Sequence, residues 1–252
     1  MIRLEHLTKL YGSFRAVDDI SMHVPKGSLH GFLGPNGAGK TTTLRMIAGI
    51  LRPSAGRIVV GDHDLATHAL LAKAKLGFIP DRPFVYDKLT GAEFLRFVAG
   101  LYGQEGQLVE KRMDEQLEIF ELSAWKSELI ESYSHGMKQK LIISSALIHR
   151  PELIVVDEPM VGLDPRAARL LKRLFREYCG RGGTVLMSTH TLEIAEALCD
   201  RLAIIQGGKI VAEGTMDEIR RQHAAGDVGL EDLFLKLTGG AAAAELKAVL
   251  ET

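Results

Sequence analysis

Three stretches near the start of the chain alternate between apolar and polar positions. They are IRLEHLT at 2–8, AVDDISMHV at 16–24 and GRIVVGD at 56–62, and turn-forming residues separate them. A period of two is typical of strands that bury one face and leave the other in water. The pattern therefore predicts three β-strands in the first part of the chain.

Further strands are predicted from continuous apolar runs, which occur where helices cover both faces of a sheet. The runs are SLHGFLG at 28–34, LGFIP at 76–80, LIVVDEP at 153–159 and TVLMSTH at 184–190. Helical patterns are expected at 40–51 and 165–179, and LAIIQGGKIVAEG at 202–214 has the Gly-Gly turn of a hairpin. Buried strands that alternate with helices predict a parallel α/β sheet.

One part of the chain contains helical patterns without strands between them. We expect helices near 90–102, 107–122 and 136–149, so an α-helical subdomain is predicted at about 82–150, inserted into the α/β domain. The α/β domain itself is expected to span 1–220. The remaining segment, 221–252, ends in GGAAAAELKAVLET and is predicted as a C-terminal helical tail, with a surface helix and a frayed end as equal alternatives for its last residues.

The loop after the strand at 28–34 has the composition of a phosphate-binding loop. GPNGAGKTT fits the pattern G-x-x-x-x-G-K-[ST] and lies between a buried strand and a helix, as that motif requires. Its glycines allow positive φ and a backbone that wraps an anion, Lys40 can reach the β- and γ-phosphates, and the Thr41 hydroxyl can ligate Mg²⁺. The predicted nucleotide-binding residues are Gly34, Pro35, Asn36, Gly37, Ala38, Gly39, Lys40, Thr41 and Thr42.

Two acids follow the apolar strand at 153–159. Asp157 is expected beside the phosphate loop, where it would orient Mg²⁺ or its waters, and Glu158 would orient or deprotonate an attacking water. Such a pair often caps a helix, so it is informative only because a phosphate loop precedes it. The expected ligands are therefore ATP and Mg²⁺.

Two features of the sequence indicate which base the nucleotide carries: the lack of a guanine-reading motif and one aromatic residue near the start of the chain. Guanine-specific proteins of this class read the base with an Asn-Lys-x-Asp loop, and the single asparagine, Asn36, lies in the phosphate loop itself. Adenine is therefore favoured. Tyr11 is the candidate for stacking on it, with an ordinary turn tyrosine as the alternative.

Composition narrows the class of partner. Hydrophobic residues make up 46% and charged residues 25% of the chain, and the formal net charge is −1, so nothing global favours nucleic acid. The arginines at 166, 169, 173 and 176 share one face of a predicted helix, which indicates a solvated amphipathic helix. The two cysteines make no metal-type pair and are consistent with a reducing, cytoplasmic setting.

Five motifs, taken together, make the chain resemble the ATP-binding subunit of an ABC transporter from Ile2 to about Ile219. They occur in the order of that family: the phosphate loop at 34–42, YSHGMKQ at 133–139, LIVVDEP at 153–159, GLDP at 162–165 and STH at 188–190. The resemblance implies a P-loop NTPase (RecA-like) parallel sheet core with an N-terminal antiparallel β subdomain and an inserted α-helical subdomain. It also implies an Mg-dependent ATPase.

The resemblance also assigns a role to a second helix start, SYSHGMKQK at 132–140. Ser134 and Gly136 match the serine and second glycine of the family's LSGGQ signature, which closes on the nucleotide held by a second subunit. A head-to-tail homodimer or heterodimer with two shared ATPs is therefore expected. In the same way His190 resembles the switch histidine near the γ-phosphate, and Asp164 resembles an acid that links the two sites, or caps a helix, or both.

The sequence departs from the family pattern at Asp81, where the family usually has glutamine, sometimes glutamate, as a Mg²⁺ contact. Asp81 is kept as a candidate metal residue. The form YSxGMKQ and the tail GLEDLFLKLTGG resemble the branch that exports drugs, lipids or polysaccharides.

The resemblance implies an integral membrane permease as partner and a place in the cytoplasm, peripheral on the inner face of the cell membrane. Phe84, Val85 and Tyr86 are expected to form an exposed apolar patch that receives a short helix of the permease. The alternative from another class is an ABC ATPase that acts on ribosomes or nucleic acid. No nucleic acid is expected, because the chain has neither a second cassette nor a long coiled-coil insertion.

Overall fold

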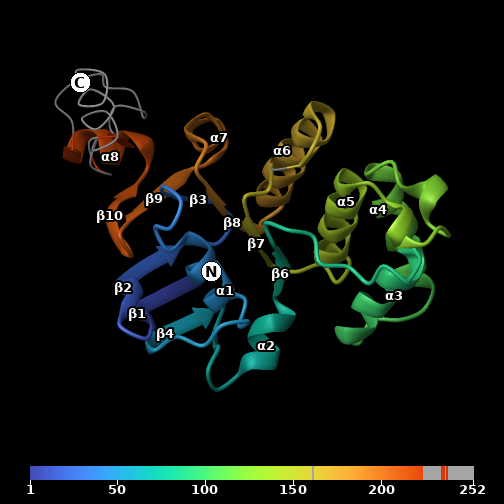
Figure 1. The fold of residues 1–252 in the computed structure, drawn as a ribbon, viewed down its shortest axis with the longest axis horizontal. Helices are drawn as coiled ribbons and strands as arrows, with labels where there is room; N and C mark the ends of the chain where they lie inside the picture. Colours follow the sequence, from blue (N-terminus) through green and yellow to red (C-terminus); the bar gives the residue numbers. More distant parts are fainter. Residues whose placement is uncertain (161, 224–233, 236, 238–252) are drawn as a thin grey trace, which may run out of the picture.

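The computed structural model describes residues 1–160, 162–223, 234, 235 and 237. A four-stranded antiparallel sheet in the order β2-β1-β4-β5 contains the N-terminal strands (Figure 1). Its strands are β1 (Ile2–Tyr11), β2 (Phe14–Val24), β4 (Ala55–Val60) and β5 (His63–Asp64). The three strands expected from period-two alternation are confirmed, and β5 is an addition that the sequence did not predict.

A six-stranded sheet in the order β10-β9-β3-β8-β7-β6 forms the centre of the molecule. Its strands are β3 (Leu29–Leu33), β6 (Leu76–Ile79), β7 (Leu153–Asp157), β8 (Thr184–Thr189), β9 (Arg201–Gln206) and β10 (Lys209–Gly214). All neighbouring pairs are parallel except the β9–β10 hairpin. The predicted α/β fold with a parallel core and an antiparallel β subdomain is confirmed.

Helix α1 lies between the two sheets and carries the phosphate loop at its start. It spans Lys40–Ile47, and Leu44, Met46 and Ile47 are fully buried in a core that also contains Ile2 of β1 and Phe32 of β3. The helix is shorter than the predicted 40–51. It ends because Gly49 adopts a positive φ of 65° and its N–H donates to the Met46 carbonyl, which is a common C-terminal stop.

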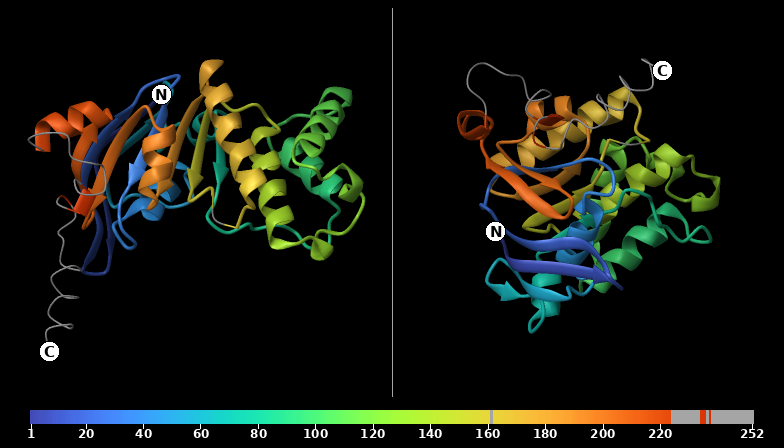
Figure 2. Two further views of the ribbon diagram at one scale, coloured as in Figure 1. Left: turned by 90° about the horizontal axis from the view of Figure 1, so that it is seen from above. Right: turned by 60° about the vertical axis from the view of Figure 1, so that its left-hand side comes forward.

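The remaining helices divide into those beside the sheets and those that form a separate helical region. The first group is α2 (Ala69–Ala74), α6 (Pro165–Gly180), α7 (Leu192–Leu198) and α8 (Met216–His223). The second is α3 (Gly91–Leu101), α4 (Gln107–Ile119) and α5 (His135–Leu147), with short 3₁₀ turns at Ser123–Trp125 and Ile130–Ser132. Figure 2 shows the second group extending away from the sheets.

Two local features explain where the helical region begins and how it is anchored. Thr90 caps α3 and exchanges hydrogen bonds with Glu93 in a capping box, so the helix starts where polar side chains satisfy its first amides. Leu141 and Ile143 of α5 are fully buried in the same core as Ile154 of β7.

Among the described residues no helix has both the length and the apolar character needed to span a membrane.

His30 is an unusual residue within the central strand β3. It is fully buried, and neither ring nitrogen has a hydrogen-bond partner within the described part of the chain. Burial, which is the largest cause, and the nearby charges of Arg201 and His23 together lower the pKa of His30 to about 4. The folded protein therefore holds a neutral imidazole at a pH where the unfolded chain would protonate it.

We expect this histidine to make the protein less stable in mild acid. Its folded pKa of about 4 lies below the ordinary histidine value of 6.5, so the unfolded state binds the extra proton between these values and stability falls as pH falls through that window. His30→Leu should remove about 2 kcal/mol of the stability change between about pH 7.5 and about pH 5. Denaturant unfolding at both pH values measures it. The exposed His68→Gln should keep the parent's slope; an unchanged slope in His30→Leu would contradict the assignment.

Candidate functional site

The phosphate loop connects β3 to α1 at the carboxyl end of the parallel sheet. Gly37 and Gly39 have positive φ values of 78° and 108°, which side chains rarely allow. A Cβ on Gly39 would lie 2.6 Å from the Ala16 carbonyl oxygen, and one on Gly34 would lie 2.4 Å from the Ile205 carbonyl oxygen. Close backbone approach and a left-handed turn therefore both require glycine in this loop.

Lys40 begins α1 and turns back over the loop. Its Nζ donates to the carbonyl oxygens of Gly34 at 2.7 Å and Pro35 at 3.2 Å, and it lies 3.7 Å from Glu158 Oε1. Burial lowers the pKa of Lys40, and the negative charges of Glu158 and Asp157 oppose that shift. The side chain is thus a nearly buried cation at the mouth of the loop.

Asp157 ends β7 next to the same loop and is almost fully buried. Ser188 Oγ donates to Asp157 Oδ1 at 2.5 Å, whereas Oδ2 is buried and makes no hydrogen bond of normal geometry with the described residues. Burial raises the pKa of Asp157; the Ser188 and Thr41 hydroxyls partly offset this, and the charges of Asp81 and Glu158 raise it further. A buried, unpartnered carboxylate oxygen near a threonine hydroxyl suits a small divalent cation such as Mg²⁺.

Glu158 and His190 form a pair at the ends of β7 and β8. His190 Nδ1 lies 2.9 Å from Glu158 Oε1, which is the oxygen that faces Lys40. Glu158 adopts a positive φ of 49°, and its N–H donates to Ser188 Oγ at 3.1 Å. A non-glycine residue in this conformation is strained, and such strain is common at functional sites.

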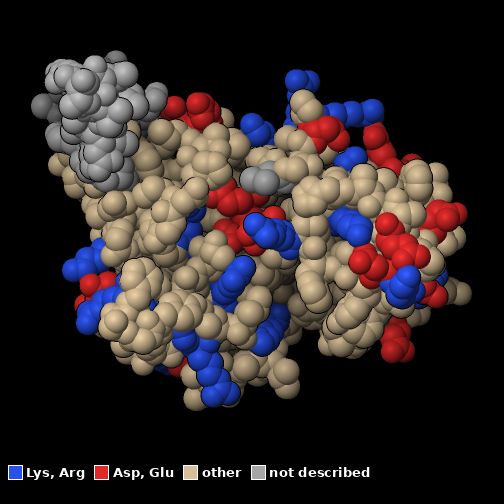
Figure 3. All heavy atoms as spheres, in the orientation of Figure 1, with Lys and Arg blue, Asp and Glu red and all other residues tan. Residues whose placement is uncertain are grey.

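A hollow of about 390 Å³ lies between the phosphate loop and the β1–β2 turn. Its lining residues are Tyr11, Phe14, Ala16, Asn36, Gly37, Gly39, Lys40, Thr41, Thr42, Asp81 and Glu158. Phe14 was not predicted as a site residue; it is paired with Tyr11 across the β1–β2 turn, so the alternation of β2 and this turn could have indicated it. Acidic and basic side chains lie side by side across the middle of this face of the molecule (Figure 3).

Asp81 lines this hollow but is already engaged by a cation. Its Oδ1 lies 3.7 Å from Arg45 Nη2 of α1, and its negative charge raises the pKa of Asp157. The structure therefore brings the predicted metal residues Thr41, Asp157 and Asp81 together, with Arg45 competing for the last of them. Their metal-binding roles stay predictions.

Ser134 and Gly136 lie outside the hollow. Ser134 caps α5 by accepting from the Met137 N–H at 3.3 Å, and it is exposed. Gly136 lies in the first turn of α5, where a Cβ would come 3.5 Å from the Gly162 carbonyl oxygen. Asp164 caps α6 by accepting from the Ala167 N–H at 2.8 Å, so the capping alternative holds for Asp164.

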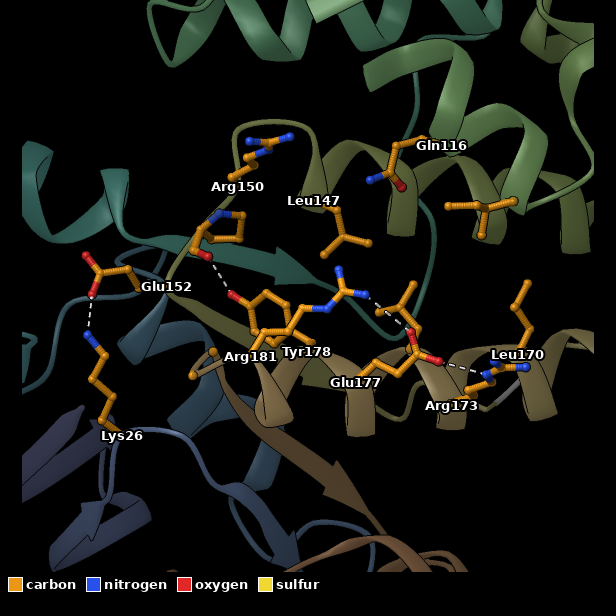
Figure 4. A pocket seen from close by; sticks show the side chains of 15 residues that line it. Lys26, Gln116, Leu147, Arg150, Glu152, Leu170, Arg173, Glu177, Tyr178 and Arg181 are labelled. Carbon is orange, nitrogen blue, oxygen red and sulfur yellow. Dashed lines mark hydrogen bonds and ion pairs between the residues drawn. The ribbon is translucent and has the colours of Figure 1, made fainter. Parts of the chain in front are cut away.

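A larger groove, of about 860 Å³, lies at the amino ends of the parallel strands, opposite to the phosphate loop (Figure 4). Pro151 and Glu152 precede β7 and Gly183 precedes β8, so this groove is at the amino ends of the strands. Tyr178 donates to the Pro151 carbonyl there, and Glu177 pairs with Arg173. The groove contains none of the predicted site residues.

Comparison with known proteins agrees with this geometry. The ABC transporter family model matches residues 17–161. The daunorubicin resistance ATP-binding protein DrrA3 of Streptomyces coeruleorubidus is 36% identical over 94% of this chain and 78% of its own length. The linearmycin resistance ATP-binding protein LnrL of Bacillus subtilis is 38% identical over 87% of this chain and 70% of its own length.

A solved structure extends the likeness to three dimensions. An ATP-binding subunit of an ABC transporter superposes with a TM-score of 0.90 at 34% identity, covering 94% of this chain and 99% of the other. The identification made from the five motifs is confirmed. The chain belongs to the ABC transporter family, and within that family it is an ATP-binding, ATP-hydrolysing subunit.

Proposed function

We propose that this chain is a motor subunit that pairs head to tail with a second ATP-binding subunit and drives export through a separate membrane permease. One observation carries the proposal. Beside the phosphate loop, the carboxyl ends of the parallel strands bring together Lys40, Asp157, Glu158 and His190. The protein would work in the cytoplasm on the inner face of the cell membrane. In this proposal 1–220 is the ATP-binding domain, about 82–150 its helical subdomain and 221–252 a tail; most of the tail lies outside the described residues.

The residues of the site divide the work of hydrolysis. The loop amides and the Lys40 ammonium hold the β- and γ-phosphates, and Tyr11 stacks on the adenine. Glu158 accepts a proton from, or orients, the attacking water. His190, 2.9 Å from the Glu158 carboxylate, keeps that carboxylate in place and contacts the γ-phosphate.

The metal ligands follow from the same geometry. Thr41 and Asp157 would hold Mg²⁺, because Asp157 Oδ2 is buried and without a good hydrogen bond among the described residues. Asp81 is the candidate third contact, in competition with its Arg45 partner. When bound, the metal neutralises charge on the phosphates.

The position of Ser134 supports a site shared between two subunits. Ser134 is exposed at the start of α5 and is not among the residues that line the hollow of its own chain. An exposed helix start with a serine hydroxyl that can still donate its proton can contact phosphate held elsewhere. A second subunit, identical or related, would bring its phosphate loop to this end.

Two observations favour an exporter over a protein that acts on ribosomes or nucleic acid. Relatives are named as daunorubicin and linearmycin resistance proteins, and the chain covers most of their length. The basic face of α6 is largely neutralised, since Arg166 pairs with Glu121 and Arg176 pairs with Asp200. A drug-like amphiphilic molecule is the proposed cargo of the permease.

The permease is expected to dock on an aromatic patch, which we define as Phe84, Tyr86 and Phe97. Phe84 is 77% exposed. The ring centroid of Tyr86 lies 6.3 Å from that of Phe84 and 5.5 Å from that of Phe97. The expectation that Val85 is exposed was wrong, because its side chain is partly buried against the core of the helical region.

Charge on the aromatic patch should uncouple the motor from its permease. Phe84→Glu is expected to lower permease-dependent transport at least about tenfold, because an apolar contact at an interface centre is replaced by a charge. Nucleotide binding by the isolated chain should stay at the parent level. Transport into inverted vesicles and binding of a fluorescent ATP analogue measure the two effects.

A matched control is Leu70→Glu, which changes an 85% exposed residue of α2 outside the aromatic patch and should leave transport intact. Parent-level transport by Phe84→Glu would place the docking surface elsewhere. Loss of nucleotide binding would instead assign this segment to the core.

A further inference from the structure

Ser188 is a buried hydroxyl between the two acids of the site. It lies near the end of β8, where the parallel register places it opposite Asp157 of β7. Its side chain is fully buried. In the sequence Ser188 is the first residue of the STH motif, and the motif alone indicates no role for it.

The Ser188 hydroxyl makes two hydrogen bonds of opposite sense. It donates to Asp157 Oδ1 at 2.5 Å and accepts from the Glu158 N–H at 3.1 Å. A serine hydroxyl has one proton to give and lone pairs to receive, so this single group is engaged by both neighbouring residues. The Glu158 N–H can only donate, so Ser188 Oγ accepts from it, and the hydroxyl proton goes to Asp157.

These bonds have separate consequences for the two acids. With Oδ1 occupied by Ser188, Asp157 Oδ2 is the oxygen that stays available, and the nearby Thr41 hydroxyl lowers the pKa of the same carboxyl. The bond to the Glu158 N–H supports a backbone with a φ of 49°, a conformation that a glutamate does not favour. That backbone directs the Glu158 carboxylate to His190 and Lys40.

We propose that Ser188 is a positioning residue that orients Asp157 for the metal and Glu158 for water at the same time. The inference rests on the proposed function, because Ser188 acts only through the roles proposed for Asp157 and Glu158. Removing the hydroxyl should free the Asp157 carboxylate to rotate and leave the Glu158 amide without its partner. Metal-dependent binding and turnover should therefore both suffer.

The competing explanation is a hydroxyl that only stabilises the fold, and β8 supplies a control for it. Thr184 lies at the other end of the same strand, is fully buried, and accepts from the Gly27 N–H at 3.0 Å. Thr184→Val removes a buried hydroxyl of the same strand far from the site. Ser188→Ala and Thr184→Val should lose similar stability, as judged by their melting temperatures.

The first measurement is nucleotide affinity with and without Mg²⁺, read by a fluorescent ADP analogue so that no hydrolysis is needed. In EDTA, Ser188→Ala, Thr184→Val and the parent should bind alike, since the loop amides and Lys40 act without metal. Mg²⁺ should increase the affinity of the parent for the nucleotide, and this increase should be smaller by a factor of at least about five in Ser188→Ala. Thr184→Val should keep the parent's increase.

The second measurement is steady-state ATP hydrolysis. Ser188→Ala should lower kcat about tenfold or more with a smaller change in KM, and Ser188→Thr, which keeps the hydroxyl, should restore kcat. If Ser188→Ala matches Thr184→Val in both Mg²⁺ response and kcat, Ser188 is structural and the inference is overturned. Absent hydrolysis by the parent would refute the proposed function instead, whereas the Mg²⁺ response would still decide the role of Ser188.

Discussion

Lys40→Ala is expected to abolish ATP hydrolysis and to weaken nucleotide binding by about tenfold or more. The lysine is the buried cation of the hollow, within hydrogen-bond distance of the loop carbonyls and 3.7 Å from Glu158. Without it, the β- and γ-phosphates face the acids of the site with no compensating charge. Release of phosphate and titration with a fluorescent ATP analogue measure the two effects.

Two companion variants separate binding from chemistry. Glu158→Gln keeps the shape of the side chain and removes the carboxylate, so binding should persist while hydrolysis falls by about a hundredfold or more. Lys111→Ala changes an exposed lysine of α4 whose Nζ lies 3.9 Å from Glu115, and it should behave as the parent. Normal turnover in Lys40→Ala would mean that the phosphate loop is misassigned.

A mixture of two inactive chains should regain activity if the ATP sites are shared between subunits. Lys40→Ala removes the cation from one half-site, and Ser134→Arg places bulk and charge at the exposed start of α5, the proposed other half. In a mixed dimer assembled with the permease, one composite site has both halves intact and the other has both defects. Random pairing should restore roughly a quarter of the parent's hydrolysis, because half of the dimers are mixed and each keeps one of its two sites.

Each variant assembled alone with the permease is the control and should be inactive. The isolated Ser134→Arg chain should still bind nucleotide near the parent's affinity, because Ser134 does not line its own hollow. A mixture as silent as its components would show that each chain uses its own Ser134. The proposal of a head-to-tail dimer would then be wrong.

Elements with strong periodicity were predicted well, and short or irregular ones were not. The alternation of β1 and the apolar run of β7 identified these strands directly. Helix α2 was missed because it has only 6 residues, too few to show a helical period, and it buries only Ala72. The exposure of Val85 was mispredicted for a related reason, since an irregular segment has no period that assigns a side chain to one face.

The sequence by itself determined the phosphate loop, the acids Asp157 and Glu158 after a buried strand, and the family to which the chain belongs. These signals are local, because glycine, lysine and acid positions follow from the spacing of a few neighbouring residues. Only the tertiary structure placed Phe14 in the hollow, Ser134 outside it, and Ser188 against Asp157 from a position 31 residues away. The physical reason is strand register: a parallel sheet brings together the carboxyl ends of strands that are distant in the chain, and no local pattern specifies which hydroxyl will then face which acid.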